Sequence, residues 1–396
     1  MNAHAEVAIV GGGLEGLAIA WSLAERGVTD VLVLERETLC SGMTAKSSGV
    51  VRCHYGVPSL AAMARYGIEV FSRAEEMFGT DVGYRRTGYV VGVGDANADA
   101  LRANVVMQRQ LGIDVELINH DMVAEMWPGM ALEDFAAFAY EPDGGYGDAY
   151  MTGMAFAKRA RELGVRIRQK NEVRALRQAS DGSVVGATLT NGDVVSADTV
   201  VLAVGAWSSG LAAPLGVRLP IRSQREQILL VDTGEPLGDV PVFSDLVALQ
   251  YLRREPGGVL LFGNSDHSDP EFVDPDDYVG HADPDFIETA IGKLDARLPS
   301  MPDPHIAASY TGYYDVTPDY NPLIGMSAVP GLFVAAGFSG HGYKISPAVG
   351  KLAADLLIDG RSSDTAVDGD DFRLGRFAEG DPLLSARPYV GAGEMR

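Results

Sequence analysis

The chain has 396 residues, 46% of them hydrophobic, and a formal net charge of −22. This length allows a large core and two or three domains, whereas the acidic balance excludes nucleic acid and anionic membrane surfaces as expected partners. The two cysteines, Cys40 and Cys53, are too few for a disulfide framework, and no Cys/His cluster suggests a metal site.

Two features of the sequence bear on its location. Two long uncharged stretches are interrupted by Gly, Pro and Ser, so neither predicts a membrane span. Residues 1–4 lead directly into an apolar strand, without a basic segment or a cleavage site. We therefore expect a soluble protein of the cytoplasm.

The first 35 residues predict a strand, a tight turn, a helix and a second strand. Val7–Val10 is an apolar run, Leu17–Arg26 has helical character, and Val31–Leu34 is apolar again. The turn carries the pattern GxGxxG at the end of the strand and the start of the helix. This setting is the one in which the pattern binds dinucleotides.

Each glycine of this turn has a physical reason. Gly11 permits the tight turn, Gly13 lets the backbone approach a pyrophosphate, and Gly16 allows the helix to pack closely on the strand. The helix N-terminus adds oriented N–H groups and the positive end of its dipole. Glu35 ends the next strand, where a carboxylate accepts hydrogen bonds from ribose hydroxyls and disfavours a 2′-phosphate. The other residues expected to contact the dinucleotide here are Leu14, Glu15 and Arg36.

The middle of the chain predicts helices that alternate with strands. The expected helices are Leu60–Phe78, Ala98–Leu111 and Tyr150–Leu163. The expected strands are Gly88–Val93, Val165–Arg168, Glu172–Gln178, Val184–Thr190 and Val200–Val204. The dipeptide Asn191-Gly192 is typical of a hairpin turn.

Residues 218–310 have a different character. Apolar strands at Gln227–Val231 and Val259–Gly263 alternate with loops rich in Asp, Pro and Gly, and Phe286–Leu298 predicts an amphipathic helix. This composition is typical of an antiparallel sheet that covers a pocket. After it, Leu332–Ala336 predicts a buried strand, followed by a glycine loop and a helix at Ser346–Ile358.

These patterns predict an α/β fold with two interleaved domains. A discontinuous Rossmann-like nucleotide-binding domain is expected over residues 1–80, 145–217 and 311–396. An α+β substrate domain with a mixed or antiparallel sheet is expected over residues 81–144 and 218–310.

Five motifs spread along the chain resemble those of one enzyme family. The stretch 204–208 reads VGAWS, 337–344 reads GFSGHGYK, and 44–52 reads TAKSSGVVR. Two shorter stretches, Asp143–Tyr146 and Thr317–Asp319, fall at matching places. Together they resemble the D-amino-acid oxidase superfamily, in its sarcosine oxidase and glycine oxidase branch. The 44–52 loop is most similar to the β-subunit of heterotetrameric sarcosine oxidase.

The resemblance implies that the nucleotide is FAD. The glycine loop before the predicted helix at Ser346 exposes N–H groups, which suit the negative charge on the N1–C2=O edge of a reduced flavin. Glu172 and Val173 fit the strand whose backbone contacts adenine in this family. The remaining residues implied to contact FAD are Thr44, Lys46, Ser47, Ser48, Gly49, Gly205, Trp207, Gly340, His341, Gly342, Tyr343 and Lys344.

The resemblance also implies a substrate site. Arg52 and Lys344 match the Arg and Lys that bind a substrate carboxylate over the flavin, the first as a planar fork and the second as a point charge. His341, Tyr251 and Tyr314 are further catalytic candidates, although a locally packed histidine and, for Tyr251, a buried core tyrosine are the alternative interpretations. Lys46 is expected either at a phosphate or the flavin, or in solvent.

Three departures from the family limit what the resemblance carries over. Gly312 stands where monomeric sarcosine oxidases attach FAD to a cysteine. The segment 258–263 lacks the lysine with which those enzymes activate oxygen, and the predicted substrate domain contains only Lys293. Residues 144–149 lack the histidine that carries a second, covalent flavin in the β-subunit relative. We therefore expect noncovalent FAD alone, with oxygen or another electron acceptor.

The expected function is FAD-dependent oxidation of the C–N bond of a small amino acid or N-alkyl amino acid, of the sarcosine, glycine or imino-acid type. Hydride transfer to flavin N5 would give an imine, with the protein supplying orientation and electrostatics. The alternatives are oxidation of a 2-hydroxy acid, with His54 or His341 as general base, and a role as the flavin subunit of a larger hetero-oligomeric oxidase. An NAD(P)-dependent reductase is disfavoured because no second glycine fingerprint occurs.

Overall fold

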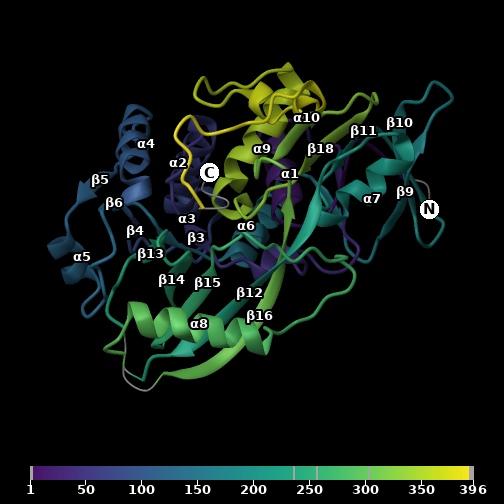
Figure 1. Ribbon diagram of the computed structural model, residues 1–396. Helices are drawn as coiled ribbons and strands as arrows, with labels where there is room; N and C mark the ends of the chain where they lie inside the picture. The colour runs from purple at the N-terminus through teal and green to yellow at the C-terminus, as the bar shows by residue number, and fades with distance from the viewer. Residues whose placement is uncertain (1–2, 235–236, 256, 302–303, 392–396) are drawn as a thin grey trace.

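The computed structural model describes residues 3–234, 237–255, 257–301 and 304–391. Within these residues the chain forms two large sheets that lie side by side, each with helices packed against it (Figure 1). The first sheet carries the N-terminal glycine turn. The second sheet and helix α8 (Pro284–Arg297) form the lower and left parts of the view in Figure 1.

The first sheet has the strand order β17-β18-β11-β1-β2-β8, and a hairpin of β9 and β10 extends from β11. Its strands are β1 (Ala3–Val10), β2 (Val31–Leu34), β8 (Arg166–Arg168), β9 (Val173–Gln178), β10 (Val184–Leu189), β11 (Val194–Leu202), β17 (Leu323–Met326) and β18 (Leu332–Ala336). Four consecutive pairs of this sheet are parallel: β18 with β11, β11 with β1, β1 with β2, and β2 with β8. Their carboxyl ends therefore meet at one edge, which is where open parallel sheets bind ligands.

Helices on the first sheet form a closely packed layer. Helix α1 (Leu14–Glu25) contacts α6 (Ala149–Glu162) and α9 (Gly342–Asp359), and α9 in turn contacts α2 (Pro58–Ser72). Trp21 of α1 stacks on Phe156 of α6, with the ring centroids 5.1 Å apart. Burial of such aromatic surface supplies much of the stabilisation of a core.

The second sheet has the order β16-β12-β15-β14-β13-β4-β6-β5. Its strands are β4 (Tyr89–Val93), β5 (Glu116–Ile118), β6 (Ala137–Glu141), β12 (Arg222–Asp232), β13 (Val242–Asp245), β14 (Gln250–Glu255), β15 (Val259–Asn264) and β16 (His305–Val316). Among the described residues of this sheet only β13 and β4 pair in parallel, so the sheet is mixed.

Several short elements complete the described part of the chain. A two-stranded ladder joins β3 (Val50–Val51) to β7 (Gly145–Tyr146). The remaining α-helices are α3 (Ala74–Phe78), α4 (Ala98–Gln110), α5 (His120–Met126), α7 (Ser208–Ala212) and α10 (Arg376–Glu379).

The predicted fold class is confirmed, and two of the predicted helices need correction. The helix expected at Ser346 begins at Gly342, because residues 342–345 already have helical backbone, so Lys344 lies on the first turn of α9. Pro347 is accommodated inside this helix, where the Ser346 hydroxyl donates to the Tyr343 carbonyl at 2.9 Å. The helix expected at Leu60–Phe78 is divided at Arg73 into α2 and α3.

The division into two domains stays a prediction. Strands of the second sheet come from residues 89–141 and 222–316, and β16 crosses the predicted boundary at residue 311. The predicted ranges also include residues 1–2, 235–236, 256, 302–303 and 392–396, which lie outside the described part of the chain.

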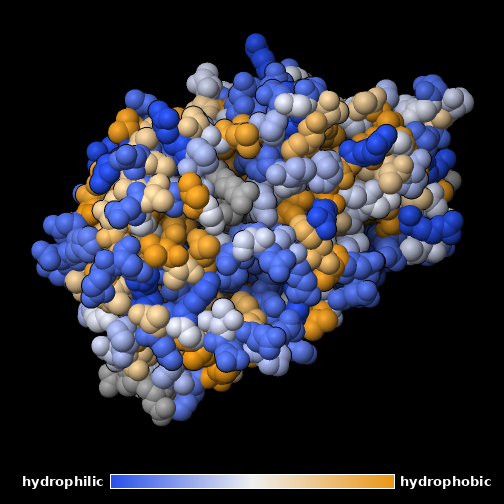
Figure 2. All heavy atoms as spheres, viewed as in Figure 1, coloured by the Kyte–Doolittle hydropathy of each residue, from blue (hydrophilic) through white to orange (hydrophobic). Residues whose placement is uncertain are grey.

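One face of the molecule is mainly hydrophilic (Figure 2). Figure 2 shows hydrophilic side chains over most of one face, with smaller apolar patches between them. None of the helices in the described residues has the length and apolar character needed to cross a membrane. The same residues contain no group of three or more His, Cys, Asp or Glu side chains placed to hold a metal ion.

Candidate active site

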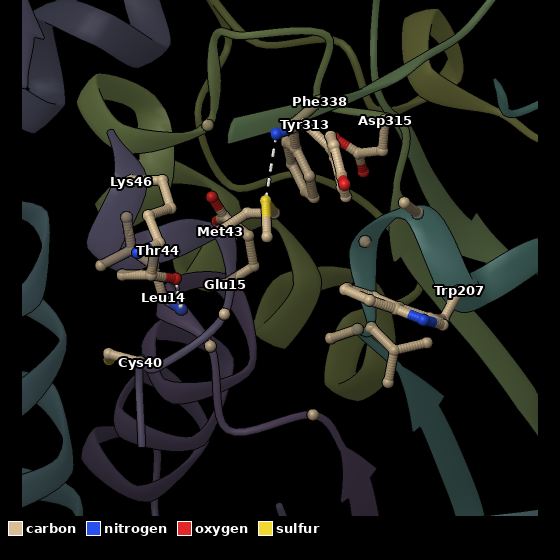
Figure 3. A pocket seen from close by; sticks show the side chains of 18 of the residues that line it. Leu14, Glu15, Cys40, Met43, Thr44, Lys46, Trp207, Tyr313, Asp315 and Phe338 are labelled. Atoms are coloured by element: carbon tan, nitrogen blue, oxygen red, sulfur yellow. Dashed lines mark hydrogen bonds between the residues drawn. The ribbon is translucent and has the colours of Figure 1, made fainter. Parts of the chain in front are cut away.

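A cavity of about 620 Å³ lies where the turn after β1 meets strands of the second sheet (Figure 3). The predicted residues on its wall are Gly11, Gly13, Leu14, Glu15, Glu35, Arg36, Thr44, Lys46, Ser47, Ser48, Glu172, Val173, Gly205, Trp207, Tyr251, Gly340, Gly342 and Tyr343. The predicted residues that are not part of its wall are Gly16, Gly49, Arg52, His341 and Lys344. The cavity thus collects most of the residues expected to hold FAD.

The first glycine turn is shaped by close backbone approach. Gly11 has a φ of +109°, and a Cβ there would overlap the backbone oxygen of Ala203, so another residue would be both strained and crowded. A Cβ on Gly16 would overlap the Gly11 carbonyl, which explains why a glycine off the wall is still needed. Glu35 accepts a hydrogen bond from the Gly12 N–H at 2.8 Å, so this carboxylate fixes the turn from the end of β2.

One end of the cavity is bounded by an aromatic ring and two charged side chains. The Arg36 guanidinium carbon lies 4.2 Å from the centre of the Trp207 ring. The Trp207 indole N–H donates to Asp276 at 2.7 Å, and Arg36 lies 3.5 Å from the same carboxylate. Asp276 belongs to the loop after β15 and was not predicted, because nothing in an Asp-rich loop marks one member as a partner of Trp207.

The second glycine loop meets the cavity beside a buried carboxyl group. The Gly337 N–H donates to Asp315 at 2.6 Å, which ties the loop to β16. Burial raises the pKa of Asp315 to about 6, although hydrogen bonds from the loop backbone act in the opposite direction. Helix α9 begins at Gly342, directly after this loop, so its N-terminus faces the same cavity as that of α1.

Glu15 lies between these two helix N-termini. A Cβ on Gly342 would stand 2.8 Å from the Glu15 Oε1 atom, so the glycine makes room for the carboxyl group. Burial, and secondly the charge of Asp315, raise the pKa of Glu15 well above its ordinary value. Its Oε2 atom has no hydrogen-bond partner among the described residues. A buried, unsatisfied polar atom in this position fits a cavity that receives a polar ligand.

The two predicted cations meet around one tyrosine. The Arg52 guanidinium lies 4.3 Å and the Lys344 ammonium 6.0 Å from the centre of the Tyr55 ring, and the His341 ring lies 5.1 Å from it. Both cations are buried. Sequence reasoning had not identified Tyr55, which follows the 44–52 motif without any pattern of its own.

His341 is held as a neutral ring. Its Nε2 atom donates to the Tyr320 carbonyl at 2.9 Å. Burial, then the charges of Lys344 and Arg52, lower the pKa of His341 well below its ordinary value. The ring therefore packs beside the cations rather than adding a third charge to them.

The second sheet adds polar side chains that sequence reasoning missed. Gln224 donates to Glu226 at 2.6 Å and to the Nδ1 atom of His267 at 2.8 Å. Glu226 lines the cavity together with Tyr251 and Tyr314. Of the three hydrogen-bonded residues, Glu226 is on the cavity wall and Gln224 and His267 are off it. Isolated polar residues carry no motif, so the pairing of β12 with its neighbours is what brings the three together.

The structure shows where the residues that depart from the family pattern lie relative to the cavity. Gly312 lines the cavity, and a Cβ there would stand 3.2 Å from the Lys46 Cβ atom. Lys293 is not part of the cavity wall and donates to Asn264 at 2.9 Å. Cys40 is on the wall, and burial raises its thiol pKa to about 12, so it is not a reactive thiolate.

A glycine turn before a helix N-terminus, a second glycine loop and a covering mixed sheet are features of a dinucleotide-binding protein. The profile of the FAD-dependent oxidoreductase family, DAO, matches residues 6–356. The chain belongs to this family, and the predicted resemblance and the predicted FAD cofactor are both confirmed.

Relatives of known function include several oxidoreductases that act on amines. The chain is 30% identical to 4-methylaminobutanoate oxidase (formaldehyde-forming) of Paenarthrobacter nicotinovorans, over 99% of this chain and 48% of the relative. It is 28% identical to sarcosine oxidase subunit beta of Rhizobium meliloti, over 95% and 89% of the two chains. The chain thus spans about half the length of the first of these relatives and most of the second.

Solved structures agree with these relationships. L-proline dehydrogenase from P. horikoshii superposes with a TM-score of 0.87 and 25% identity, over 96% of this chain and 100% of the other. Glycine oxidase from Geobacillus kaustophilus superposes with a TM-score of 0.79 and 26% identity, over 94% and 99%.

Proposed function

We propose that the protein oxidises the C–N bond of a small amino acid or N-alkyl amino acid and gives an imine. The observation that carries this proposal is the pair of buried cations, Arg52 and Lys344, which face the same Tyr55 ring. Two buried positive charges favour an anionic group strongly, and relatives named for methylaminobutanoate, sarcosine, proline and glycine all act on amines that carry a carboxylate.

The residues of the chain would hold both partners of the reaction. The turn at Gly11 and Gly13 and the N-terminus of α1 would hold the pyrophosphate of FAD, and the loop before α9 would hold the flavin edge. Bound FAD supplies a two-electron acceptor. Arg52 and Lys344 would bind the substrate carboxylate, which positions the oxidisable carbon. Tyr251 and Glu226 on the opposite strands would face the amine.

The low basicity of the histidine beside the cations supports amine rather than alcohol oxidation. A 2-hydroxy acid requires a general base for its hydroxyl proton. His341 donates its Nε2 proton to a backbone carbonyl, and its pKa is lowered by burial and by the two cations. The two ring nitrogens of His54 face other side chains, with Nε2 at 2.7 Å from the Tyr389 hydroxyl and Nδ1 at 3.7 Å from Glu141. An amine that enters without its extra proton needs no such base.

A role as one subunit of a larger oxidase is the second candidate. The match to a protein named sarcosine oxidase subunit beta covers 89% of that subunit, which favours it. The proposed enzyme holds FAD noncovalently and passes its electrons to oxygen or to another acceptor. It is located in the cytoplasm, as a single chain or as an oligomer.

Anaerobic reduction of the purified flavoprotein tests the reaction class. Amino acids, N-methylamino acids and 2-hydroxy acids are added in parallel, and loss of the flavin absorption is followed. We expect bleaching by one or more amines and none by the matched hydroxy acids. Bleaching by hydroxy acids alone would contradict the proposal.

A further inference from the structure

The C-terminal segment 383–390 is fixed at both ends by buried polar side chains. At its start, the Leu383 N–H donates to Asp319 at 2.9 Å, and Asn321 donates to the Leu383 carbonyl at 2.9 Å. At its end, the Val390 N–H donates to Asn97 at 2.8 Å, and the Asn97 amide returns a bond to the Val390 carbonyl at 3.2 Å. In Figure 1 this segment runs in yellow from the region of α10 toward α2 and α4.

The middle of the segment packs on the residues that follow Arg52. The Tyr389 hydroxyl and the His54 Nε2 atom lie 2.7 Å apart, and the two rings stack with their centroids 5.9 Å apart. Both side chains are buried. A Cβ on Gly56 would overlap the Ser385 hydroxyl, so the segment and the 54–56 backbone are in direct contact.

His54 in turn holds the guanidinium of Arg52. The Arg52 Nη1 atom donates to the His54 carbonyl. Glu141 fixes the same stretch from the other side, because its Oε2 atom accepts from the Cys53 N–H at 2.7 Å and its Oε1 atom lies 3.7 Å from His54 Nδ1. The His54 side chain thus lies between Glu141 and Tyr389, and its carbonyl sets the direction of the Arg52 fork.

We propose that Tyr389 is a positioning residue for the substrate carboxylate, acting on Arg52 through His54, and that segment 383–390 is therefore part of the substrate site. This inference rests on the proposed function, in which Arg52 binds the carboxylate. A guanidinium recognises a carboxylate through two parallel hydrogen bonds, so small changes in its direction weaken binding.

The substitution Tyr389→Phe removes only the hydroxyl that meets His54. Substrate affinity is measured anaerobically for the amine found in the panel and for its neutral carboxamide. We expect about three- to ten-fold weaker binding of the carboxylate form, in line with loss of one buried hydrogen bond. FAD content, the rate at saturating substrate and binding of the carboxamide stay unchanged. Tyr150→Phe, at an exposed tyrosine of α6, is the matched control and changes none of these.

A double-mutant cycle with Arg52→Lys separates positioning from general loss of stability. In the Arg52→Lys background the Tyr389→Phe change has no further effect on carboxylate binding, because the planar fork is already absent. A lowered melting temperature of Tyr389→Phe with unchanged carboxylate binding would overturn the positioning role and leave the proposed function intact. Unchanged binding in Arg52→Lys itself would remove Arg52 from the carboxylate site, and both proposals would fall.

Discussion

The two ends of the cavity are built from different parts of the chain. The nucleotide end, formed by the glycine turn 11–16, the loop 337–342 and Trp207, presents mainly backbone atoms and helix N-termini. The proposed substrate end consists of side chains from elements far apart in sequence: Tyr251 and Glu226 lie on the cavity wall, and Arg52 and Lys344 lie off the wall, buried around Tyr55. A backbone site needs particular glycines, whereas a side-chain site needs correct packing around each group.

The largest effect is expected from Gly11→Ala at the nucleotide end. The added Cβ would overlap the Ala203 carbonyl, and φ is +109°. Overpacking of about 1–3 kcal/mol and backbone strain of about 1–3 kcal/mol should together abolish FAD binding. Gly27→Ala is the matched control, since Gly27 has a φ of +88° but no neighbour within 4 Å. FAD titrations should separate the two variants, and equal FAD affinities would show that the close approach at Gly11 is unimportant.

At the substrate end, Arg52→Ala should weaken substrate binding and leave FAD binding unchanged. It removes one partner of a desolvated charge pair, so binding of anionic substrates should weaken by about 2–4 kcal/mol. FAD content should not change, because Arg52 contacts Tyr55 and the His54 carbonyl rather than the glycine turn or Trp207. Substrate titration and flavin content are measured on the same preparation. A loss of FAD from this variant would contradict the separation of the two ends.

The raised pKa of Asp315, which ties the second glycine loop to β16, predicts that the stability of the fold depends on pH. Its pKa is raised by burial from 3.8 to about 6, so folding favours its neutral form. The stability that this proton binding contributes is present below about pH 4 and is lost as the pH rises through about 6, by up to roughly 3 kcal/mol. Asp315→Asn should reduce the fall in melting temperature between these pH values, and Glu15, whose pKa burial also raises, should retain part of it. Asp269→Asn, at an exposed position, should keep the original slope; an unchanged slope in Asp315→Asn would show that another group titrates there.

The smallest effect is expected where the second sheet reaches the nucleotide end. Asp276 joins Trp207 and Arg36, but the side chains of Asp276 and Arg36 are 68% and 43% exposed. Exposed pairs contribute about 0–1 kcal/mol, so Asp276→Asn should speed FAD dissociation by only about two- to five-fold. Stopped-flow release of FAD measures this rate. A far larger increase would mean that the loop after β15 governs retention of the cofactor.

The sequence predicted the nucleotide end in more detail than the substrate end. The glycine turn, Glu35 and Trp207 lie on one cavity wall because short motifs at strand ends dictate local backbone geometry. Strands β2 and β18 also begin and end where apolar runs predicted. The start of α9 was misplaced because Pro347 and the glycines conceal a helix that side-chain bonds stabilise.

The remaining substrate-side residues had no local signal. His267, Gln224 and Glu226 meet only because β12 and the end of β15 lie side by side. Tyr389 reaches His54 from a position 335 residues further along the chain. Contacts of this kind follow from tertiary packing, and composition or periodicity does not encode them locally.

Reconstitution of the apoprotein with FAD tests the central claim most directly. Stepwise addition of FAD, followed by removal of the unbound cofactor, gives the number of flavins retained by each chain. The arrangement of two glycine loops and two helix N-termini around one cavity predicts one tightly held FAD. A protein that stays colourless and retains none would contradict the assignment of this cavity to the cofactor.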